Sequence, residues 1–209
     1  MSGQRVDVAT WSRREVFKLF RSYDRPHYAI TARIDVSRLM RDRKATGLSP
    51  FRVTMYAIGA GLAEVPALRM RFRGDVVTQY EDVHLSPAIP LDTGEFGYAY
   101  LPWQPDRATF DADVAKAIAA IRAGQPLNAN QGQIENVAYL SCLPWLDYTS
   151  LDNALPGRDD CIPRISWGKI VPTGNGHDMA MTLQVHHALV DGRHAGVFFD
   201  ATQAALNTT

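Results

Sequence analysis

Two adjacent histidines, His186 and His187, end an apolar segment in which hydrophobic residues alternate, and an Asp-Gly pair begins four residues after the second histidine. Imidazole titrates near neutral pH, so it can take a proton from a hydroxyl as that oxygen attacks and return it to a leaving group. A side chain at the end of a strand is held in place by the strand and still faces open space. The pattern therefore indicates a general base.

The same residues allow plainer interpretations. A His-His pair can pack in a core or bind a metal adventitiously, and Asp191 can cap a helix that follows it. A metal site is the less favoured of these, because no Asp or Glu lies four residues away on a shared helix face. Cys142 and Cys161 show neither CxxC spacing nor a nearby set of histidines, so they predict neither zinc nor a disulfide framework.

The helices and strands around the two histidines must hold them in position. Apolar residues at helical spacing predict four helices. The first begins with a capping box formed by Ser12 and Glu15, and the second begins at Ser49-Pro50, an N-cap residue before a proline. Gly124 is expected to end the third. The predicted helices span residues of about 12–22, 50–62, 110–121 and 191–205.

Alternating apolar residues predict strands between these helices. Short strands with turns at 73–75 and 92–94 are expected between residues 69 and 101. The remaining predicted strands span about 28–36, 136–142, 164–171 and 179–186. Together these elements predict an α/β chain with helices covering a mixed sheet, forming a single domain over residues 1–209.

The composition excludes several classes of partner. With 22 basic and 22 acidic residues among 209, the chain has no net charge that would attract nucleic acid or an anionic membrane. No run approaches the roughly 20 apolar residues that span a bilayer, and the N-terminus lacks the apolar run of a signal peptide. Two thiols fit a reducing compartment. We therefore expect a soluble cytoplasmic protein with no nucleic-acid or membrane partner.

The segment HHALVDG at 186–192 resembles the HHxxxDG signature of the chloramphenicol acetyltransferases, a family of CoA-dependent acyltransferases. The resemblance extends to four further segments, in the order and at the spacings of that family. They are WSRREVF (11–17), VPALRMRFRGD (65–75), LPWLDYTSLD (143–152) and ISWGK (165–169). It implies the acetyltransferase fold and acetyl transfer from acetyl-CoA to a hydroxyl of chloramphenicol. Acetyl-CoA would be a co-substrate, with no permanently bound cofactor and no metal.

The resemblance also implies roles for individual residues. His187, the second histidine, corresponds to the general base, and Ser150 corresponds to the donor that stabilises the tetrahedral oxyanion; otherwise Ser150 is a turn residue. Asp191 and Arg13 correspond to an ion pair that supports the histidine loop without relaying a proton, and a surface location for Arg13 is the plain alternative. His186 is expected to pack beneath the site.

Other correspondences concern the substrates. Ser166 matches a threonine that holds a water near the reaction centre, and Lys169 matches a lysine near bound CoA, although a solvated lysine is the ordinary alternative. The acceptor pocket is expected to include Phe20, Tyr28, Phe96 and Tyr98. Phe20 stands where many family members have tyrosine, and Tyr98 replaces a small residue. The polar segment 127–132 stands where the family tends to have an aromatic wall.

The family forms trimers with each active site between two subunits, which implies a homotrimer and an inactive monomer. Three alternatives remain open at this point. The chain can acetylate another small alcohol or amine, it can be a dihydrolipoamide acyltransferase domain, or it can be a non-catalytic protein that keeps the fold. The second is disfavoured because such domains carry a D-H-R-x-x-D-G type of signature where this chain has V-H-H-A-L-V-D-G.

Overall fold

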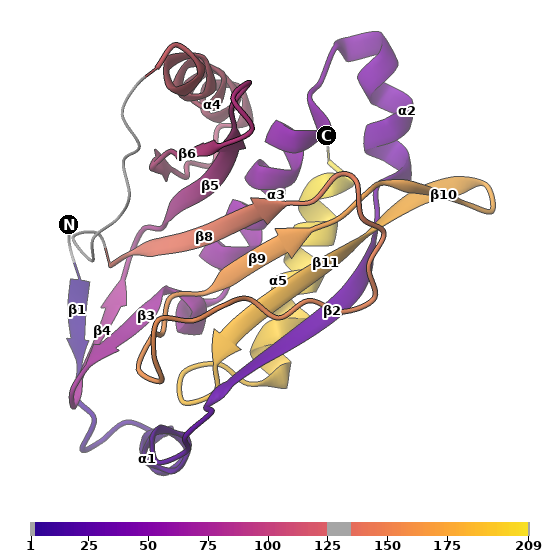
Figure 1. Ribbon diagram of the computed structural model, residues 1–209. Coiled ribbons are helices and arrows are strands. Elements are labelled where there is room, and N and C mark those ends of the chain that lie inside the picture. The colour runs from indigo at the N-terminus through magenta and orange to yellow at the C-terminus, as the bar shows by residue number, and fades with distance from the viewer. Residues whose placement is uncertain (1–2, 125–134, 209) are drawn as a thin grey trace.

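The structure of the chain is a computed structural model that describes residues 3–124 and 135–208. In these residues the strands form two sheets, a small antiparallel one of order β1-β4-β3 and a large mixed one (Figure 1). The large sheet has the order β10-β11-β9-β8-β5-β6, with β2 added beside β11 and β7 beside β5. Within the same residues, no helix is both long and apolar enough to cross a membrane.

The helices and strands have the following bounds. The helices are α1 (Arg14–Arg21), α2 (Ser37–Thr46), α3 (Pro50–Glu64), the 3-10 helix η1 (Pro66–Arg69), α4 (Arg107–Arg122) and α5 (Gly192–Leu206). The strands are β1 (Gly3–Val6), β2 (His27–Asp35), β3 (Met70–Arg73), β4 (Val76–Tyr80), β5 (His84–Pro90), β6 (Phe96–Tyr98), β7 (Leu101–Pro102), β8 (Val137–Cys142), β9 (Arg164–Trp167), β10 (Val171–Thr173) and β11 (Gly176–His186). This confirms the predicted α/β fold with a mixed sheet.

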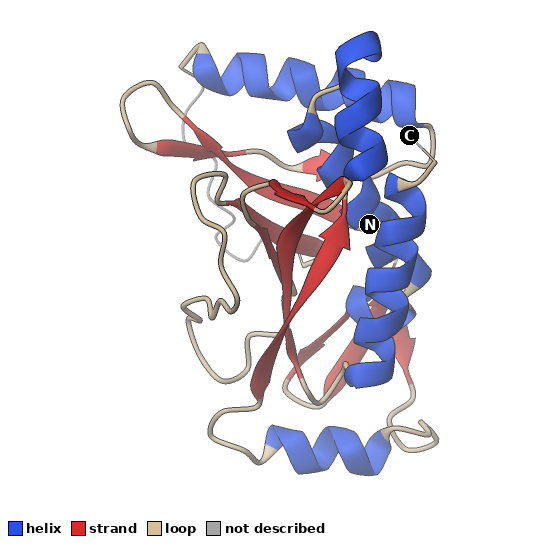
Figure 2. Ribbon diagram, turned by 90° about the vertical axis from the view of Figure 1, so that its right-hand side faces the viewer, coloured by secondary structure: helices blue, strands red, loops and turns tan. Residues whose placement is uncertain are grey.

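The long strand β11 has two different faces because side chains alternate along a strand. Met179, Met181, Leu183 and Val185 are buried in the hydrophobic core with residues of α3 and α5. Figure 2 shows the long helices on one side of the sheet and extended loops on the other. The loop after β8, residues 143–163, crosses that second face in front of β11 and β2 (Figure 1).

Helices α3 and α5 pack closely because Gly61 of α3, at their contact, has no side chain. A Cβ atom added to Gly61 would lie 2.3 Å from the hydroxyl of Thr202 and 2.9 Å from the carbonyl oxygen of Phe198. A substitution here would push the two helices apart. Since α5 follows the histidine loop, this packing helps to fix the position of that loop.

Several predicted boundaries are confirmed. The hydroxyl of Ser49 accepts a hydrogen bond from the Arg52 N–H at the start of α3, and Gly124 follows α4 with a φ of 95°. The carboxylate of Asp191 accepts bonds from the N–H groups of Arg193 and His194 at the start of α5.

The predicted capping box of Ser12 and Glu15 is wrong. Helix α1 has Arg13 at its N-cap with no side-chain cap, so it starts one residue later than that box requires. The predicted strand 164–171 is also wrong, because Gly168 and Lys169 interrupt it. The Lys169 N–H bonds the carbonyl of Leu146 in the loop, and a Cβ on Gly168 would lie 2.7 Å from that same oxygen.

Besides the short 3-10 helix η1, the sequence patterns missed three elements. Helix α2 is strongly polar, with only Leu39 buried, so it lacks the apolar stripe that marks a packed helix. Strands β1 and β10 are short and lie in exposed parts of the sheets. All three lack the apolar periodicity on which prediction from sequence depends.

Candidate active site

His187 is the first residue after β11, and aromatic rings hold its side chain. The Phe20 ring lies parallel to the imidazole, with centroids 3.7 Å apart and planes 7° apart, and the Tyr28 ring lies 4.7 Å away at an angle. The backbone N–H of His187 donates to the carbonyl of Pro26 at 2.8 Å. The side chain is half-buried, and its Nδ1 has no hydrogen-bond partner among the described residues. Within residues 3–124 and 135–208, ring packing rather than a carboxylate therefore orients this imidazole.

His186 occupies a different environment. It is buried, its Nδ1 accepts a bond from the Ala188 N–H, and its Nε2 lies 3.1 Å from the carbonyl oxygen of Arg158. That oxygen can only accept, which assigns the proton to Nε2 and makes the ring neutral. Burial, with a smaller effect of nearby His27, lowers the pKa of His186 to about 4. His186 thus packs beneath the loop, and of the two histidines only His187 reaches solvent.

Arg13 and Asp191, 178 residues apart in the chain, are in contact. The Arg13 guanidinium donates to Asp191 Oδ2 at 2.5 Å, with side chains that are 19% and 34% exposed. Burial alone would raise the pKa of Asp191, but the hydrogen bonds from Arg13 and the His194 N–H outweigh it and hold the pKa below its usual value. Asp191 therefore stays ionised and joins α1 to the start of α5, and among the described residues its carboxylate bonds Arg13, Arg193 and His194 rather than His187.

Replacing Asp191 by asparagine is expected to lower the free energy of unfolding by about 1–2 kcal/mol at pH 7. The variant keeps a capping oxygen but loses the charge-assisted bond, whose value is reduced by partial exposure to water. Because folding lowers the pKa of Asp191, its contribution is present above the unfolded pKa of about 4 and is lost as the pH falls through the folded pKa.

Denaturation at fixed protein concentration between pH 3 and 7 measures this effect. The difference between wild type and variant should shrink below about pH 4. Asp200→Asn, an exposed carboxylate on α5, is the matched control and should change little. A difference that does not vary with pH would contradict a stabilising role for the Asp191 charge.

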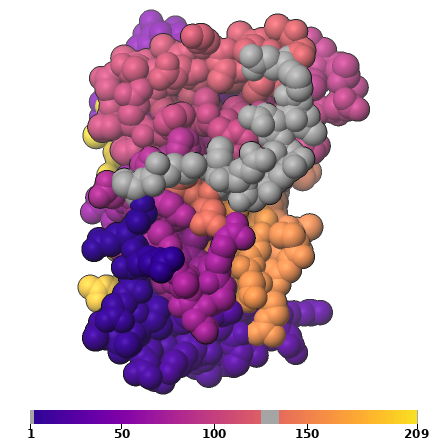
Figure 3. Space-filling view, turned by 90° about the vertical axis from the view of Figure 1, so that its left-hand side faces the viewer, coloured from indigo at the N-terminus to yellow at the C-terminus, as the bar shows by residue number. Residues whose placement is uncertain are grey.

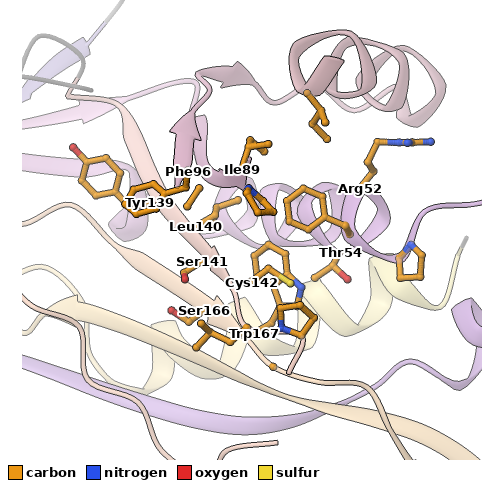
Figure 4. Close-up of a pocket in the computed structure, with 18 of the residues that line it drawn as sticks. Arg52, Thr54, Ile89, Phe96, Tyr139, Leu140, Ser141, Cys142, Ser166 and Trp167 are labelled. Atoms are coloured by element: carbon orange, nitrogen blue, oxygen red, sulfur yellow. The ribbon is translucent and has the colours of Figure 1, made fainter. Parts of the chain in front are cut away.

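A large cavity opens beside the other predicted residues. It has a volume of about 1320 Å³ (Figure 4). Residues of α2, α3, α4, β5, β6, β8 and β9 and of the segments after β8 and β9 line it. Ser166, Lys169, Phe96 and Tyr98 line it, and the rings of Phe96 and Tyr98 pack edge to face. Its volume exceeds that of a typical small-molecule site, so it has room for more than one substrate group.

The cavity wall is mostly apolar with a few unpaired hydroxyls. Ser141 and Ser166 lie side by side on β8 and β9 (Figure 4), where they are register partners. The hydroxyls of Ser166 and of Ser86 are buried, and neither has a hydrogen-bond partner among the described residues. A buried hydroxyl without a partner is costly, so each is ready to bind a polar ligand atom or a water.

Sequence reasoning missed several lining residues, including Ser86, Cys142, Phe51 and Trp167. They belong to strands and a helix that look like ordinary core in the sequence, and their place in the cavity wall depends on how these elements pack together. Burial raises the pKa of the Cys142 thiol to about 12. The thiol is therefore protonated at neutral pH and is not a nucleophile.

The predicted site residues do not all meet within one chain. Of the residues that the structure describes, the cavity lining includes neither His187 nor the two rings beside it, Phe20 and Tyr28. Ser150 lies exposed in the loop after β8, outside both places. The residues of the segment 127–132 lie outside the described residues. Within one chain, His187, Ser150 and the cavity are thus three separate features.

No group of three or more His, Cys, Asp or Glu side chains that could hold a metal ion occurs in residues 3–124 and 135–208. Cys142 and Cys161 are both free thiols. These features present the imidazole of His187, the hydroxyls of Ser150 and Ser166, and the exposed Lys169 in the cavity lining.

Known proteins resemble this chain over nearly its whole length. The profile of the chloramphenicol acetyltransferase family matches residues 1–203. Chloramphenicol acetyltransferase 2 of Escherichia coli is 25% identical over 205 residues, covering 97% of this chain and 96% of that protein. The chloramphenicol acetyltransferase of Staphylococcus aureus is 26% identical over 207 residues, covering 97% and 95%.

Solved structures show the same relationship. A chloramphenicol acetyltransferase superposes with a TM-score of 0.91 and 26% identity, covering 98% of this chain and 100% of the other. A probable dihydrolipoamide acetyltransferase from Listeria monocytogenes superposes with a TM-score of 0.70 at 16% identity, covering 95% and 92%. The second comparison supports the fold alone.

Proposed function

Because this chain belongs to the chloramphenicol acetyltransferase family of acyltransferases, we propose that it transfers the acetyl group of acetyl-CoA to a hydroxyl of chloramphenicol, with His187 as the general base. The observation that carries this proposal is the environment of His187. Its imidazole is partly exposed at a strand end and is fixed between Phe20 and Tyr28, while Asp191 is engaged by Arg13.

The reaction follows from these groups. His187 takes the proton of the acceptor hydroxyl as its oxygen attacks the thioester carbon, which gives a tetrahedral intermediate with a negative oxygen. The hydroxyl of Ser150 donates a hydrogen bond to that oxygen, where the charge develops. When the carbon–sulfur bond breaks, the leaving thiolate takes the proton from the imidazolium, and the ester and free CoA are released.

The proposal requires His187 and Ser150 to come from different copies of the chain in a homotrimer. Large apolar side chains are exposed on both segments: Trp145 is 67% exposed five residues before Ser150, and Leu19 is 51% exposed next to Phe20. Such surfaces favour burial against a partner. In a closed cyclic trimer, the His187 face of one copy would cover the Ser150 loop and the cavity of the next.

This arrangement gives the remaining residues their roles. Phe20 and Tyr28 of one copy would face Phe96 and Tyr98 of the other across the acceptor site. Burial raises the pKa of Tyr28 to about 12, so its hydroxyl stays protonated, and it donates a long hydrogen bond to the carbonyl of Val190 at 3.4 Å. The unpaired hydroxyl of Ser166 would hold a water, and the exposed Lys169 would meet the phosphates of CoA.

One observation favours a different acceptor with the same chemistry. The Tyr98 ring lines the cavity and packs on Phe96, so it takes up space in the proposed acceptor site. Extra or missing groups in such a pocket change selectivity by about 10- to 200-fold, and an unmatched hydrogen bond changes it by more. Another small alcohol or amine is therefore the second candidate.

We expect acetyl-CoA and chloramphenicol together to release free thiol, with formation of an acetyl ester. Thiol release followed by its absorbance change, with each substrate omitted in turn, measures this, and mass spectrometry identifies the product. A panel of alcohols, amines and dihydrolipoamide extends the assay. Turnover of another alcohol or amine without chloramphenicol would establish the second candidate. Turnover of dihydrolipoamide alone, or no turnover at all, would contradict the proposed function.

A further inference from the structure

A buried glutamine on β11 binds the loop that carries Ser150. Gln184 is only 2% exposed, and its side chain lies on the face of β11 opposite the core. Its Oε1 accepts hydrogen bonds from the backbone N–H and from the side-chain amide of Asn153, both at 2.8 Å. Its Nε2 donates to Asp152 Oδ1 at 2.5 Å. Both ends of the amide are therefore used on residues that closely follow Ser150.

The same loop is attached on the other side of Ser150. The Tyr148 hydroxyl donates to the carbonyl of Ser166 at 2.8 Å, and the Thr182 hydroxyl lies 3.3 Å from the Tyr148 oxygen. One residue earlier, the Arg33 guanidinium donates to Asp147 Oδ1 at 2.6 Å. Ser150 thus lies on a short exposed stretch between two attachment points, both of which reach the strands that also position His187.

These side-chain bonds are what orders the loop near Ser150. Residues 143–163 contain no helix or strand that would fix their backbone. An oxyanion donor acts only if its hydroxyl is held where the charge develops, and a small displacement can cost a large factor in rate. Of the attachments that follow Ser150, the one through Gln184 is nearer to the serine than the one from His186 to Arg158, and its glutamine is buried, where hydrogen bonds are the more costly to break.

We propose that Gln184 is a positioning residue for the Ser150 hydroxyl. It acts through Asp152 and Asn153 and does not itself touch a substrate. The inference rests on the proposed role of Ser150. It also means that one strand serves two sites of the proposed trimer, because β11 supplies His187 to one site and, through Gln184, orders the serine of the next.

The test is a double-mutant cycle in kcat. Gln184→Met, which keeps the side-chain length and removes the hydrogen bonds to Asp152 and Asn153, should lower kcat about tenfold with little change in the KM for acetyl-CoA. In a Ser150→Ala background the same replacement should change kcat less than about twofold, because no hydroxyl remains to be positioned. Gln203→Met is the matched control, since Gln203 makes two similar bonds to the backbone of Asp35 far from the loop.

Asp152→Ala removes the hydrogen bond between Gln184 and Asp152 by changing its exposed partner. This variant tests the same contact if Gln184→Met does not fold. It should show the same pattern. An equal loss in both backgrounds would assign Gln184 a general structural role and overturn the inference. Full activity in Ser150→Ala alone would refute the serine donor of the proposed function, and the inference with it.

Discussion

Replacing His187 by alanine is expected to lower kcat by about a thousandfold while the protein stays folded and still binds acetyl-CoA. The half-buried imidazole lies at the surface end of β11 and makes no side-chain hydrogen bond through Nδ1, so its removal leaves no buried partner unsatisfied. Its contacts with Phe20 and Tyr28 are the main structural loss. Steady-state assays, thermal unfolding and calorimetric titration with CoA measure the three quantities.

His177→Ala is the matched control for this variant. His177 lies near the start of β11, at the opposite end of the strand from His187, and is partly exposed. It should retain full activity. A His187→Ala variant that remains folded and keeps its activity would remove the general base from the proposed mechanism, whatever the acceptor.

The sequence was sufficient to predict the framework around His187. Alternation of apolar residues over 179–186 predicts β11 because one face of that strand packs against helices. The ends of α3 and α5 could be predicted because Ser49 and Asp191 cap them through local bonds. Each of these features depends on residues within a few positions of one another, where spacing carries the information.

The remaining features depend on contacts that spacing does not encode. The pairing of Arg13 with Asp191 came only from a family resemblance, because nothing local links residues 178 positions apart. The cavity depends on the shape of the large sheet and on an irregular loop. Gln184 could have been noticed from the sequence: with Thr182 and His186 it gives β11 a polar second face, which indicates that something other than helices covers that face.

The predicted acceptor residues lie in two separate places in one chain, and this bears on how an acceptor site could form. The acceptor residues expected in one pocket fall into two groups, Phe20 and Tyr28 beside His187 and Phe96 and Tyr98 in the cavity. Figure 3 shows that the N-terminal segment and the loop after β8 share one surface, where Arg158 of the loop bonds the backbone of Arg21. In the proposed trimer, the two groups would take part in one reaction because copies of the chain come together.

Replacing Ser150 by alanine is expected to lower kcat by about a hundredfold, with the KM for acetyl-CoA nearly unchanged. The hydroxyl would act only on the negative oxygen that forms during the reaction, so its loss should spare substrate binding. Thr149→Val, which removes the hydroxyl of the exposed neighbouring residue, is the matched control. A loss below about twofold for Ser150→Ala would contradict the donor role.

Combining the two variants tests where the halves of each site come from. If His187 and Ser150 of one site belong to different chains, each interface of a mixed trimer pairs the histidine of one copy with the serine of the next. A cyclic trimer containing both His187→Ala and Ser150→Ala chains then always has one interface with both residues intact, so mixed trimers should regain about a third of the wild-type activity. If both residues of a site came from one chain, mixing would restore nothing, because every chain would carry one of the two defects. Activity of separately purified and co-refolded chains therefore decides whether the site is shared between copies.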